Sequence, residues 1–279
     1  MTFLRRSELP PRLRAIHDPP SRLFLRGSGP AELLGRPSVA IVGARACSSY
    51  GAQVARMLGR DLARAGLVVV SGLARGIDAE AHRGALDANG HTIGVLGCGI
   101  DRDYPAVHAT LAATIAKGSL LVSEYEPGVE PAPWRFPARN RIIAGLAAAT
   151  VVVEARERSG ALITADFALE EGREVFAVPG EITSALSAGT NDLLRLGASP
   201  LTSAMDVLEL FDLAPRASET GTVGPLAAQV LDRLRLGAAS ADELARATGV
   251  DVAKVTGALV ELELAGVAEE GEGRYRASG

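Results

Sequence analysis

The chain has 279 residues, and a hydrophobic share of 47% excludes a disordered protein. Its formal net charge of −4 does not exclude a polyanion as partner, but such a partner would need a local cluster of positive charge. The longest nearly apolar run, 142–153, is too short to span a bilayer, and no apolar signal segment follows the first residues. We therefore expect a cytoplasmic protein with no membrane partner, in which Cys47 and Cys98 are reduced thiols.

The chain opens with a short arginine-rich segment, 1–36, which holds seven arginines against three acidic residues. From 37 to 213, short β-branched runs alternate with helical patterns. The expected strands are 38–43, 67–72, 91–97, 119–124, 150–155 and 174–180. The expected helices are 49–65, 78–89, 106–117, 140–148, 160–172, 190–196 and 206–213. This alternation predicts a doubly wound, extended Rossmann-like α/β domain with a mostly parallel sheet.

The last quarter of the chain has a different pattern. Residues 214–225 are rich in Pro, Gly, Ser and Thr and predict a linker. Amphipathic helices are expected at 226–236, 240–247 and 252–265, followed by residues that can form a β-hairpin. Residues 226–279 are therefore expected to form a small winged-helix-like domain.

Sequence signatures of common catalytic sites are missing. The chain lacks a P-loop, a dinucleotide fingerprint, a nucleophile elbow and any Cys/His spacing suited to zinc. His82 lies four residues after Asp78, and hydrogen-bonded support of the preceding turn is the favoured interpretation of that pair. We predict a protein that is not an enzyme and that uses no cofactor and no metal.

The loops that follow the expected strands carry arginines and aromatic residues. In open α/β sheets the functional crevice lies beyond the carboxyl ends of the strands, and helix N-termini there suit phosphate. The arginines expected on this rim are Arg45, Arg139, Arg141, Arg156 and Arg158. Internal salt bridges, or a solvated charge run around Glu157, are the alternatives. Phosphate binding is favoured for the first three, because separate loops bring them to one edge.

Aromatic residues gather in the same loops, although they make up only 4% of the chain. Tyr104, Tyr125, Trp134 and Phe136 all fall there, and rings beside arginines are typical of proteins that bind single-stranded nucleic acid. Packing of the rings as plugs over the sheet is the alternative for Tyr104 and Trp134. Phe136 is the favoured stacking residue.

Six motifs in the same order resemble the DprA (Smf) family of DNA-processing proteins over about residues 20–210. They are VGARACSSYG, SGLARGIDAEAHRGAL, GCGIDRDYP, SEYEPGVEPAPWRFPARNRIIAGL, VVVEARERSGALITADFALEEGREVFAVPG and GTNDLLRLGA. The resemblance implies a single-stranded DNA-binding protein of natural transformation that protects incoming strands, forms a homodimer and loads RecA recombinase. The DNA-binding residues that it implies are Gly43, Arg45, Phe136, Arg139, Asn140, Arg141, Ser159, Gly160 and Thr164. Many members carry a helical module before the Rossmann-like part, and 1–36 are too few to form it.

Two other functions remain open at this point. The first is a nucleotide-processing enzyme of the lysine-decarboxylase-like phosphoribohydrolase type, whose P-G-G-x-G-T motif is absent from the corresponding turn, 159–163. The second is a transcription regulator that uses the winged helix. Its presumed recognition helix, 251–265, holds one lysine against three acidic residues, which is a poor surface for phosphates.

Overall fold

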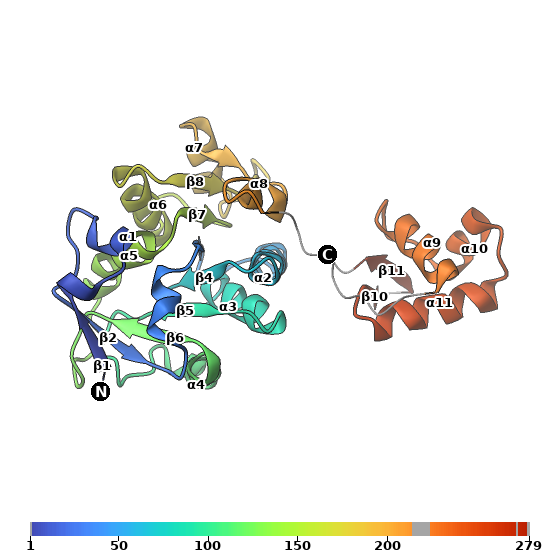
Figure 1. Ribbon diagram of the computed structural model, residues 1–279. Coiled ribbons are helices and arrows are strands. Elements are labelled where there is room, and N and C mark those ends of the chain that lie inside the picture. The colour runs from blue at the N-terminus through green and yellow to red at the C-terminus, as the bar shows by residue number, and fades with distance from the viewer. Residues whose placement is uncertain (1, 214–223, 272, 278–279) are drawn as a thin grey trace. The chain divides into compact units, whose positions relative to one another are not determined.

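The chain divides into two compact units, Met1–Pro215 and Arg216–Gly279 (Figure 1). The computed structural model describes residues 2–213, 224–271 and 273–277. The predicted linker, 214–225, lies outside the described residues except for Gly224 and Pro225, which cap and begin a helix. In the described part of the chain, no helix combines the length and the apolar character that crossing a bilayer requires.

A single sheet forms the centre of the first unit. Within residues 2–213 nine strands pair in the order β1-β2-β6-β5-β4-β3-β7-β8-β9. Their bounds are β1 Thr2–Arg5, β2 Arg22–Arg26, β3 Ser38–Val42, β4 Val68–Ser71, β5 Thr92–Val95, β6 Leu120–Ser123, β7 Ala149–Val152, β8 Glu174–Ala177 and β9 Ser199–Pro200. The strands from β3 to β9 pair in parallel, which confirms the predicted doubly wound, mostly parallel sheet.

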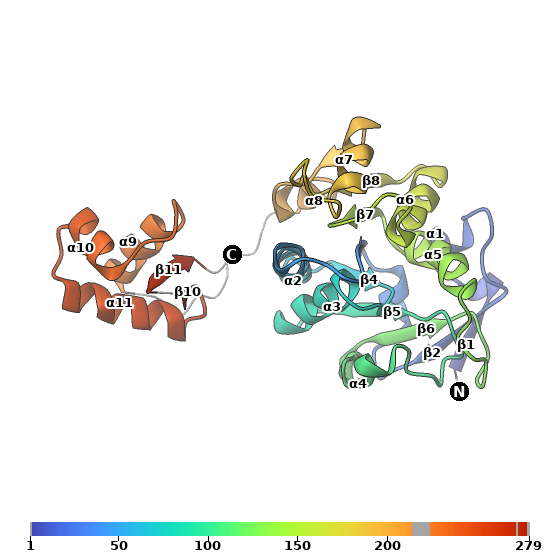
Figure 2. The ribbon, with the colours of Figure 1, turned by 180° about the vertical axis from the view of Figure 1, so that it is seen from behind.

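Helices cover both faces of this sheet (Figures 1 and 2). Their bounds are α1 Pro11–Arg14, α2 Ser49–Arg64, α3 Ile77–Asp87, α4 Ala109–Gly118, α5 Arg135–Leu146, α6 Gly160–Glu170, α7 Ala188–Arg195 and α8 Ala204–Glu209, with 3-10 turns η1 Arg6–Glu8, η2 Ala31–Gly35 and η3 Ala106–His108. Residues of α1, α5, α6 and α7 share one apolar core with the sheet, and residues of α2, α3 and α8 share another. From β3 the chain winds outward through β6 and then returns to β7 on the other side of β3. The carboxyl ends of β3 and β7 therefore form the topological switch point, where a ligand crevice is expected.

The predicted start of the helix at 140–148 is wrong by five residues, since α5 begins at Arg135. Pro137 suggested a loop at this point of the sequence. A proline in the first turn of a helix costs little, because its missing N–H would have no partner within the helix. Phe136 and Arg139 are therefore carried by a helix and not by a loop.

Residues 1–36 were predicted to be a segment separate from the α/β domain, but two strands of this segment join the sheet. β2 pairs antiparallel with β6, and β1 pairs antiparallel with β2, so both extend the sheet at one edge. The pattern Arg22-Leu23-Phe24-Leu25-Arg26 explains this, because Leu23 and Leu25 face one core while Phe24 faces another. A period of two is the strand signal that the arginine content of this segment obscured.

The second unit confirms the predicted winged-helix-like domain. It contains α9 Pro225–Leu234, α10 Ala241–Thr248, α11 Val252–Leu264 and the antiparallel pair β10 Ala268–Gly271 and β11 Arg274–Ala277. Apolar side chains of the three helices form a core of its own, which includes Val230, Leu244 and Leu259. Ala239 pairs with Tyr275 and so ties the turn before α10 to the hairpin.

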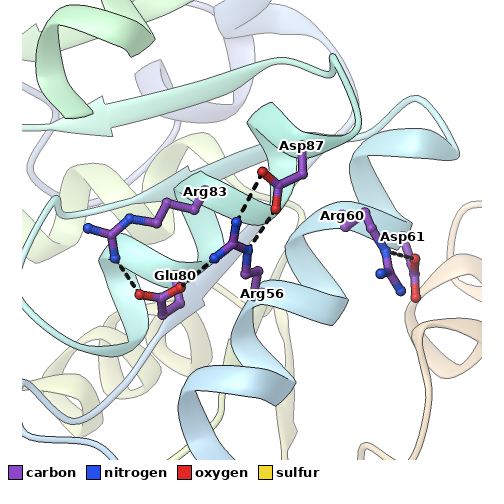
Figure 3. Close-up of polar contacts among 6 residues, drawn as sticks. All are labelled: Arg56, Arg60, Asp61, Glu80, Arg83 and Asp87. Atoms are coloured by element: carbon purple, nitrogen blue, oxygen red, sulfur yellow. Dashed lines mark hydrogen bonds and ion pairs between the residues drawn. The ribbon is translucent and has the colours of Figure 1, made fainter. Parts of the chain in front are cut away.

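Helices α2 and α3 pack in direct contact and carry a network of ion pairs (Figure 3). Nε of Arg56 lies 2.7 Å from Oδ2 of Asp87, and Nη1 of Arg56 lies 3.8 Å from Oε2 of Glu80. Arg83 also contacts the Glu80 carboxylate. A Cβ at Gly84 would lie 2.0 Å from the carbonyl oxygen of Arg56, so only glycine permits this approach of the two backbones.

Candidate nucleic-acid interface

A cavity of about 220 Å³ opens at the carboxyl ends of β3 and β7, where the strand order reverses. Its walls come from the loops after β3, β4 and β7 and from the first turns of α5 and α6. The predicted site residues that line it are Gly43, Arg45, Phe136, Arg139, Asn140, Ser159, Gly160 and Thr164. The fold therefore brings together residues that are more than 120 positions apart in the sequence.

The N-terminus of α6 forms one wall of the cavity. Ser159 is its N-cap, and the Ser159 hydroxyl accepts a hydrogen bond from the N–H of Ala161. Nδ2 of Asn140 donates to the carbonyl oxygen of Gly160 at 3.0 Å, which fixes α5 against the start of α6. The positive end of the α6 dipole thus points into the cavity beside the arginines, an arrangement that favours an anion.

Arg139 lines the cavity from inside the fold. Only 4% of the residue is exposed, which contradicts the expectation of an arginine on the outer rim. Its Nη1 donates to the carbonyl oxygen of Gly72 at 2.9 Å, while its buried Nε has no hydrogen-bond partner among the described residues. Burial lowers the pKa of Arg139 to about 10, although the charge of Asp78 opposes this shift. Within the described residues no carboxylate oxygen lies within 4.0 Å of its guanidinium.

Asp78 shapes the loop that holds Arg139. Its Oδ2 accepts hydrogen bonds from the backbone N–H groups of Gly72, at 3.1 Å, and Ala74, at 3.3 Å. Burial raises the pKa of the Asp78 carboxyl, and the nearby Arg139 charge works against this rise. A Cβ at Gly72 would lie 2.6 Å from Nη2 of Arg139 and 2.7 Å from Oδ2 of Asp78, so this position needs glycine.

The pair of Asp78 and His82 was predicted to support the turn before α3, but His82 has a different contact. Nδ1 of His82 lies 2.6 Å from the hydroxyl of Thr92 on β5, and Asp78 alone of the pair supports the turn. The ring is fully buried, and burial lowers the pKa of His82 to about 3. His82 is therefore a neutral part of the core between α3 and β5 at neutral pH.

Arg45, from the loop after β3, supplies an exposed positive charge to the cavity. Its guanidinium carbon lies 5.6 Å from the ring centroid of Phe136, a cation–π contact. No carboxylate lies within 4.0 Å of it among the residues that the structure describes. The loop is fixed because the N–H of Ala44 donates to the backbone carbonyl oxygen of Glu154, and the N–H of Ile77 donates to the backbone carbonyl oxygen of Ala44. The Arg45 charge is thus positioned but not neutralised.

Aromatic rings continue from the cavity along the edge of the sheet. The rings of Phe136 and Tyr104 stack with centroids 5.2 Å apart, and 44% of Tyr104 is exposed. Trp134 is 63% exposed and meets Tyr125 edge to face, at 6.5 Å between centroids. The guanidinium carbon of Arg135 lies 4.8 Å from the Trp134 ring centroid. Tyr104 and Trp134 are therefore exposed rings and not plugs over the sheet.

Arg141 does not line the cavity, although it was predicted to bind DNA. Its Nη1 and Nη2 each lie 2.7 Å from an oxygen of Glu124, and its Nε lies 2.9 Å from Oδ2 of Asp18. The internal salt bridge, which was the alternative, is the observed arrangement. Residues two apart on a helix point about 200° away from each other, so Arg141 cannot face the same space as Arg139. Arg156 and Arg158 are exposed and also lie outside the cavity lining.

Glu154 is a buried residue that the sequence analysis missed. Only 5% of it is exposed, and its carboxylate accepts hydrogen bonds from the N–H and the hydroxyl of Ser48. A Cβ at Gly51 would lie 2.4 Å from the Glu154 carboxylate, so the start of α2 fits closely around it. Burial and the Glu154 charge both raise the pKa of the Cys47 thiol. An acidic residue directly after the apolar run Val151-Val152-Val153 was the available signal.

Known proteins resemble this chain over nearly all of its length. The family model of DNA recombination-mediator protein A matches residues 1–212, and that of the DprA winged helix domain matches residues 214–274. Protein Smf of Escherichia coli is 41% identical over 273 residues, covering 92% of this chain and 71% of that protein.

Two solved structures share the fold of about three quarters of this chain. DNA processing protein DprA of Streptococcus pneumoniae is 48% identical over 200 residues, covering 72% of this chain and 70% of that protein. Its X-ray structure, at 46% identity, has a TM-score of 0.71 and covers 75% of this chain and 73% of that one. DNA processing protein A of Helicobacter pylori, whose structure was solved to describe its single-stranded DNA binding mode, is 32% identical with a TM-score of 0.69, covering 76% and 97% of the two chains. The chain therefore belongs to the DNA recombination-mediator protein A (DprA) family.

Proposed function

We propose that this protein binds single-stranded DNA in the cavity at the switch point, protects incoming strands during natural transformation and loads RecA recombinase onto them. One observation carries the binding part: Arg45 and Arg139 line one cavity beside Phe136, and neither has a carboxylate within 4.0 Å among the described residues. Two positive charges in such a place need an anion, and a phosphodiester supplies one. The H. pylori relative, described as binding single-stranded DNA, supports the same ligand.

We propose a different task for each part of the cavity. The exposed guanidinium of Arg45 meets a phosphate as it arrives from solvent, and the N-terminus of α6 offers that phosphate backbone N–H groups. The stacked pair of Phe136 and the exposed Tyr104 offers an aromatic surface to an unpaired base. Bases inside a duplex do not expose their faces, so this arrangement favours a single strand.

The proposed role is binding and not catalysis. The Asp78 carboxylate, which lines the cavity, accepts hydrogen bonds from two backbone N–H groups, and the nearby Glu154 carboxylate accepts two from Ser48. Both carboxylates are thus used to hold loops. Incubation with nucleoside monophosphates, followed by assay for free base, tests the phosphoribohydrolase alternative. Release of base that Asp78→Asn abolishes would overturn the non-catalytic proposal.

Binding itself is tested by fluorescence anisotropy with labelled single-stranded and duplex oligonucleotides over a range of salt concentrations. We expect much tighter binding of single strands, with little dependence on sequence. Log affinity is expected to fall with log salt at a slope of about −0.7 per neutralised phosphate. Equal affinity for the two forms of DNA would contradict the proposal.

The proposed RecA loading and homodimer rest on the role that the family resemblance implies. If the protein loads RecA, filament formation on single strands covered by a single-strand binding protein becomes faster when this chain is added. Sedimentation equilibrium measures the homodimer directly. An unchanged filament rate would restrict the function to binding and protection of the strand.

A further inference from the structure

Besides the cavity, a basic groove of about 770 Å³ lies beside β1 and β2, at the end of the sheet opposite β8 and β9. Four arginines line it from four successive elements: Arg5 at the end of β1, Arg6 in η1, Arg14 at the end of α1 and Arg22 at the start of β2. All four side chains belong to exposed residues. This groove lies outside the cavity described above, with which it shares no lining residue.

Most of the positive charge in this groove is not neutralised by the protein. Arg22 forms an ion pair with Glu126 at 3.0 Å, and both side chains of that pair are more than half exposed. Arg5, Arg6 and Arg14 have no carboxylate oxygen within 4.0 Å among the described residues. The carboxylate of Glu8 instead accepts the backbone N–H of Arg5 at 2.8 Å.

Backbone contacts hold the groove in shape. The N–H of Arg6 donates to the carbonyl oxygen of Ser21 at 3.1 Å, which joins η1 to the residue before β2. Nη1 of Arg14 donates to the carbonyl oxygen of Ser7 at 3.2 Å. Leu9 and Leu13, between these contacts, are buried in the core. The arginines are therefore mounted on an ordered part of the fold.

The strand register places the groove on the same edge of the sheet as the cavity. Arg5 pairs with Arg22, and Phe24 pairs with Ser123, the last residue of β6. The groove thus lies at the carboxyl edge of the parallel strands, where the cavity also lies. Five strand spacings of about 4.8 Å separate β1 from β3, a distance of about 24 Å. Several nucleotides of one strand span such a distance.

Four aromatic rings, of which Tyr104 and Trp134 are exposed and Phe136 and Tyr125 are half-buried, lie in the loops at the edge between the two sites. They are the stacked pair of Phe136 and Tyr104, followed by Trp134 and Tyr125. The acidic residues of these loops are paired: Asp103 with Arg26, and Glu130 with Arg102. The edge therefore has free positive charge at both ends and stacking surfaces between them, the two features that single-strand binding surfaces combine.

We propose that the groove formed by Arg5, Arg6, Arg14 and Arg22 is a second phosphate-binding site for the same DNA strand, several nucleotides from the cavity. This inference rests on the proposed single-strand binding function. It also assigns a task to the arginine-rich beginning of the chain, which the cavity leaves unused.

The test compares oligothymidylates of about 6 and about 25 nucleotides, because only the longer one can reach both sites. The double variant Arg5→Ala, Arg6→Ala is expected to bind the long strand roughly tenfold more weakly, with a salt slope flatter by about 1.4 for two lost phosphate contacts. Its affinity for the short strand is expected to stay unchanged. The matched control is the double variant Arg36→Ala, Arg195→Ala, which removes two exposed arginines near the amino edge of the sheet and is expected to change neither affinity.

The possible outcomes separate this inference from the proposed function. If Arg45→Ala weakens binding of both strands while the groove variant weakens neither, the cavity binds DNA and the groove inference is wrong. If neither variant changes binding, the proposed function itself fails. Equal weakening of the short and long strands by the groove variant would indicate a general charge effect and contradict a second site. Loss of duplex or anionic-vesicle binding instead of single-strand binding would assign the groove to another polyanion.

A charge reversal tests the same groove with a larger perturbation. Arg6→Glu reverses one exposed charge, and we expect it to weaken binding of the long strand more than Arg6→Ala does.

Discussion

The arginines between α2 and α3 and the arginines of the cavity are the same residue type in opposite electrostatic situations. In the first region Arg56 and Arg83 face Asp87 and Glu80, and each guanidinium has a carboxylate partner (Figure 3). In the second region the two arginines of the cavity have none within 4.0 Å among the described residues. Both regions are built on α/β loops and helices of one sheet, so the fold does not account for the difference.

This difference distinguishes arginines that stabilise the fold through ion pairs from arginines whose charge is available to bind a ligand. A paired guanidinium must give up its carboxylate before it can bind phosphate, and that exchange gains little. An unpaired one gains a charge-assisted hydrogen bond at once. Arg139 has both a structural and a binding role. It donates a hydrogen bond to the carbonyl oxygen of Gly72, and it also lines the cavity without a carboxylate partner among the described residues.

The strongest test of this combination is Arg139→Ala, for which we expect the largest effect. The substitution leaves the Gly72 carbonyl without its partner, removes the charge nearest to the buried Asp78 carboxyl and opens a void. We expect the free energy of unfolding to fall by about 3 kcal/mol and single-strand affinity to be lost as well. Urea denaturation alongside anisotropy measures both. Arg139→Lys serves as the control, since it keeps the charge, and a fully stable Arg139→Ala would refute the structural half of this role.

Arg141→Ala sharpens the comparison from the other side, because Arg141 lies on the same helix as Arg139 but points away from the cavity and is already paired. Loss of its bidentate contact leaves the partly buried Glu124 carboxylate without a partner. We expect a loss of about 2 kcal/mol of unfolding free energy and an unchanged affinity per folded molecule. Combination with Glu124→Gln is expected to recover part of the stability. A large loss of affinity in a fully folded Arg141→Ala protein would return this residue to the DNA-binding set.

Phe136→Ala is expected to have a smaller effect, confined to binding. The ring stacks on Tyr104 and lies beneath the Arg45 guanidinium, so its removal deletes one base platform and one cation–π contact. We expect a loss of about 1–2 kcal/mol in binding free energy with an unchanged salt slope, because no phosphate contact is lost. Phe136→Tyr is the matched control, and a flattened slope in Phe136→Ala would show that the ring acts by positioning Arg45.

Removal of the second unit is expected to have the smallest effect. That unit has its own apolar core, and residues 216–279 carry ten acidic against seven basic side chains. A chain that ends at Pro215 is therefore expected to keep its single-strand affinity within about twofold, since the removed part contributes net negative charge. Circular dichroism verifies folding of the shortened chain. Loss of most of its affinity while folded would place part of the DNA site in the winged helix.

The sequence predicted those parts of the site that follow from strand ends and failed where neighbouring side chains decide. The β-branched runs located β3 to β8, and the arginines and aromatic residues in the loops after these strands indicated the edge of the sheet where the cavity lies. Pairing could not be foreseen in the same way, because Arg141 meets Glu124 and Asp18, which are distant in sequence. Burial of Arg139 depended on α5 starting before Pro137, a choice that local patterns left open.

The most direct test of the central claim is a paired measurement on Arg45→Ala and Arg56→Ala, two arginines on the surface of the same unit. Each variant is analysed by thermal unfolding and by single-strand binding across a salt series. We predict that Arg45→Ala loses about 1.5–3 kcal/mol of binding free energy, with a flatter salt slope and unfolding within about 0.5 kcal/mol of the original protein. Arg56→Ala is predicted to keep its affinity and to lose only stability, by up to about 1 kcal/mol. Equal losses of affinity in the two variants, or a loss of stability without a loss of affinity in Arg45→Ala, would contradict the account.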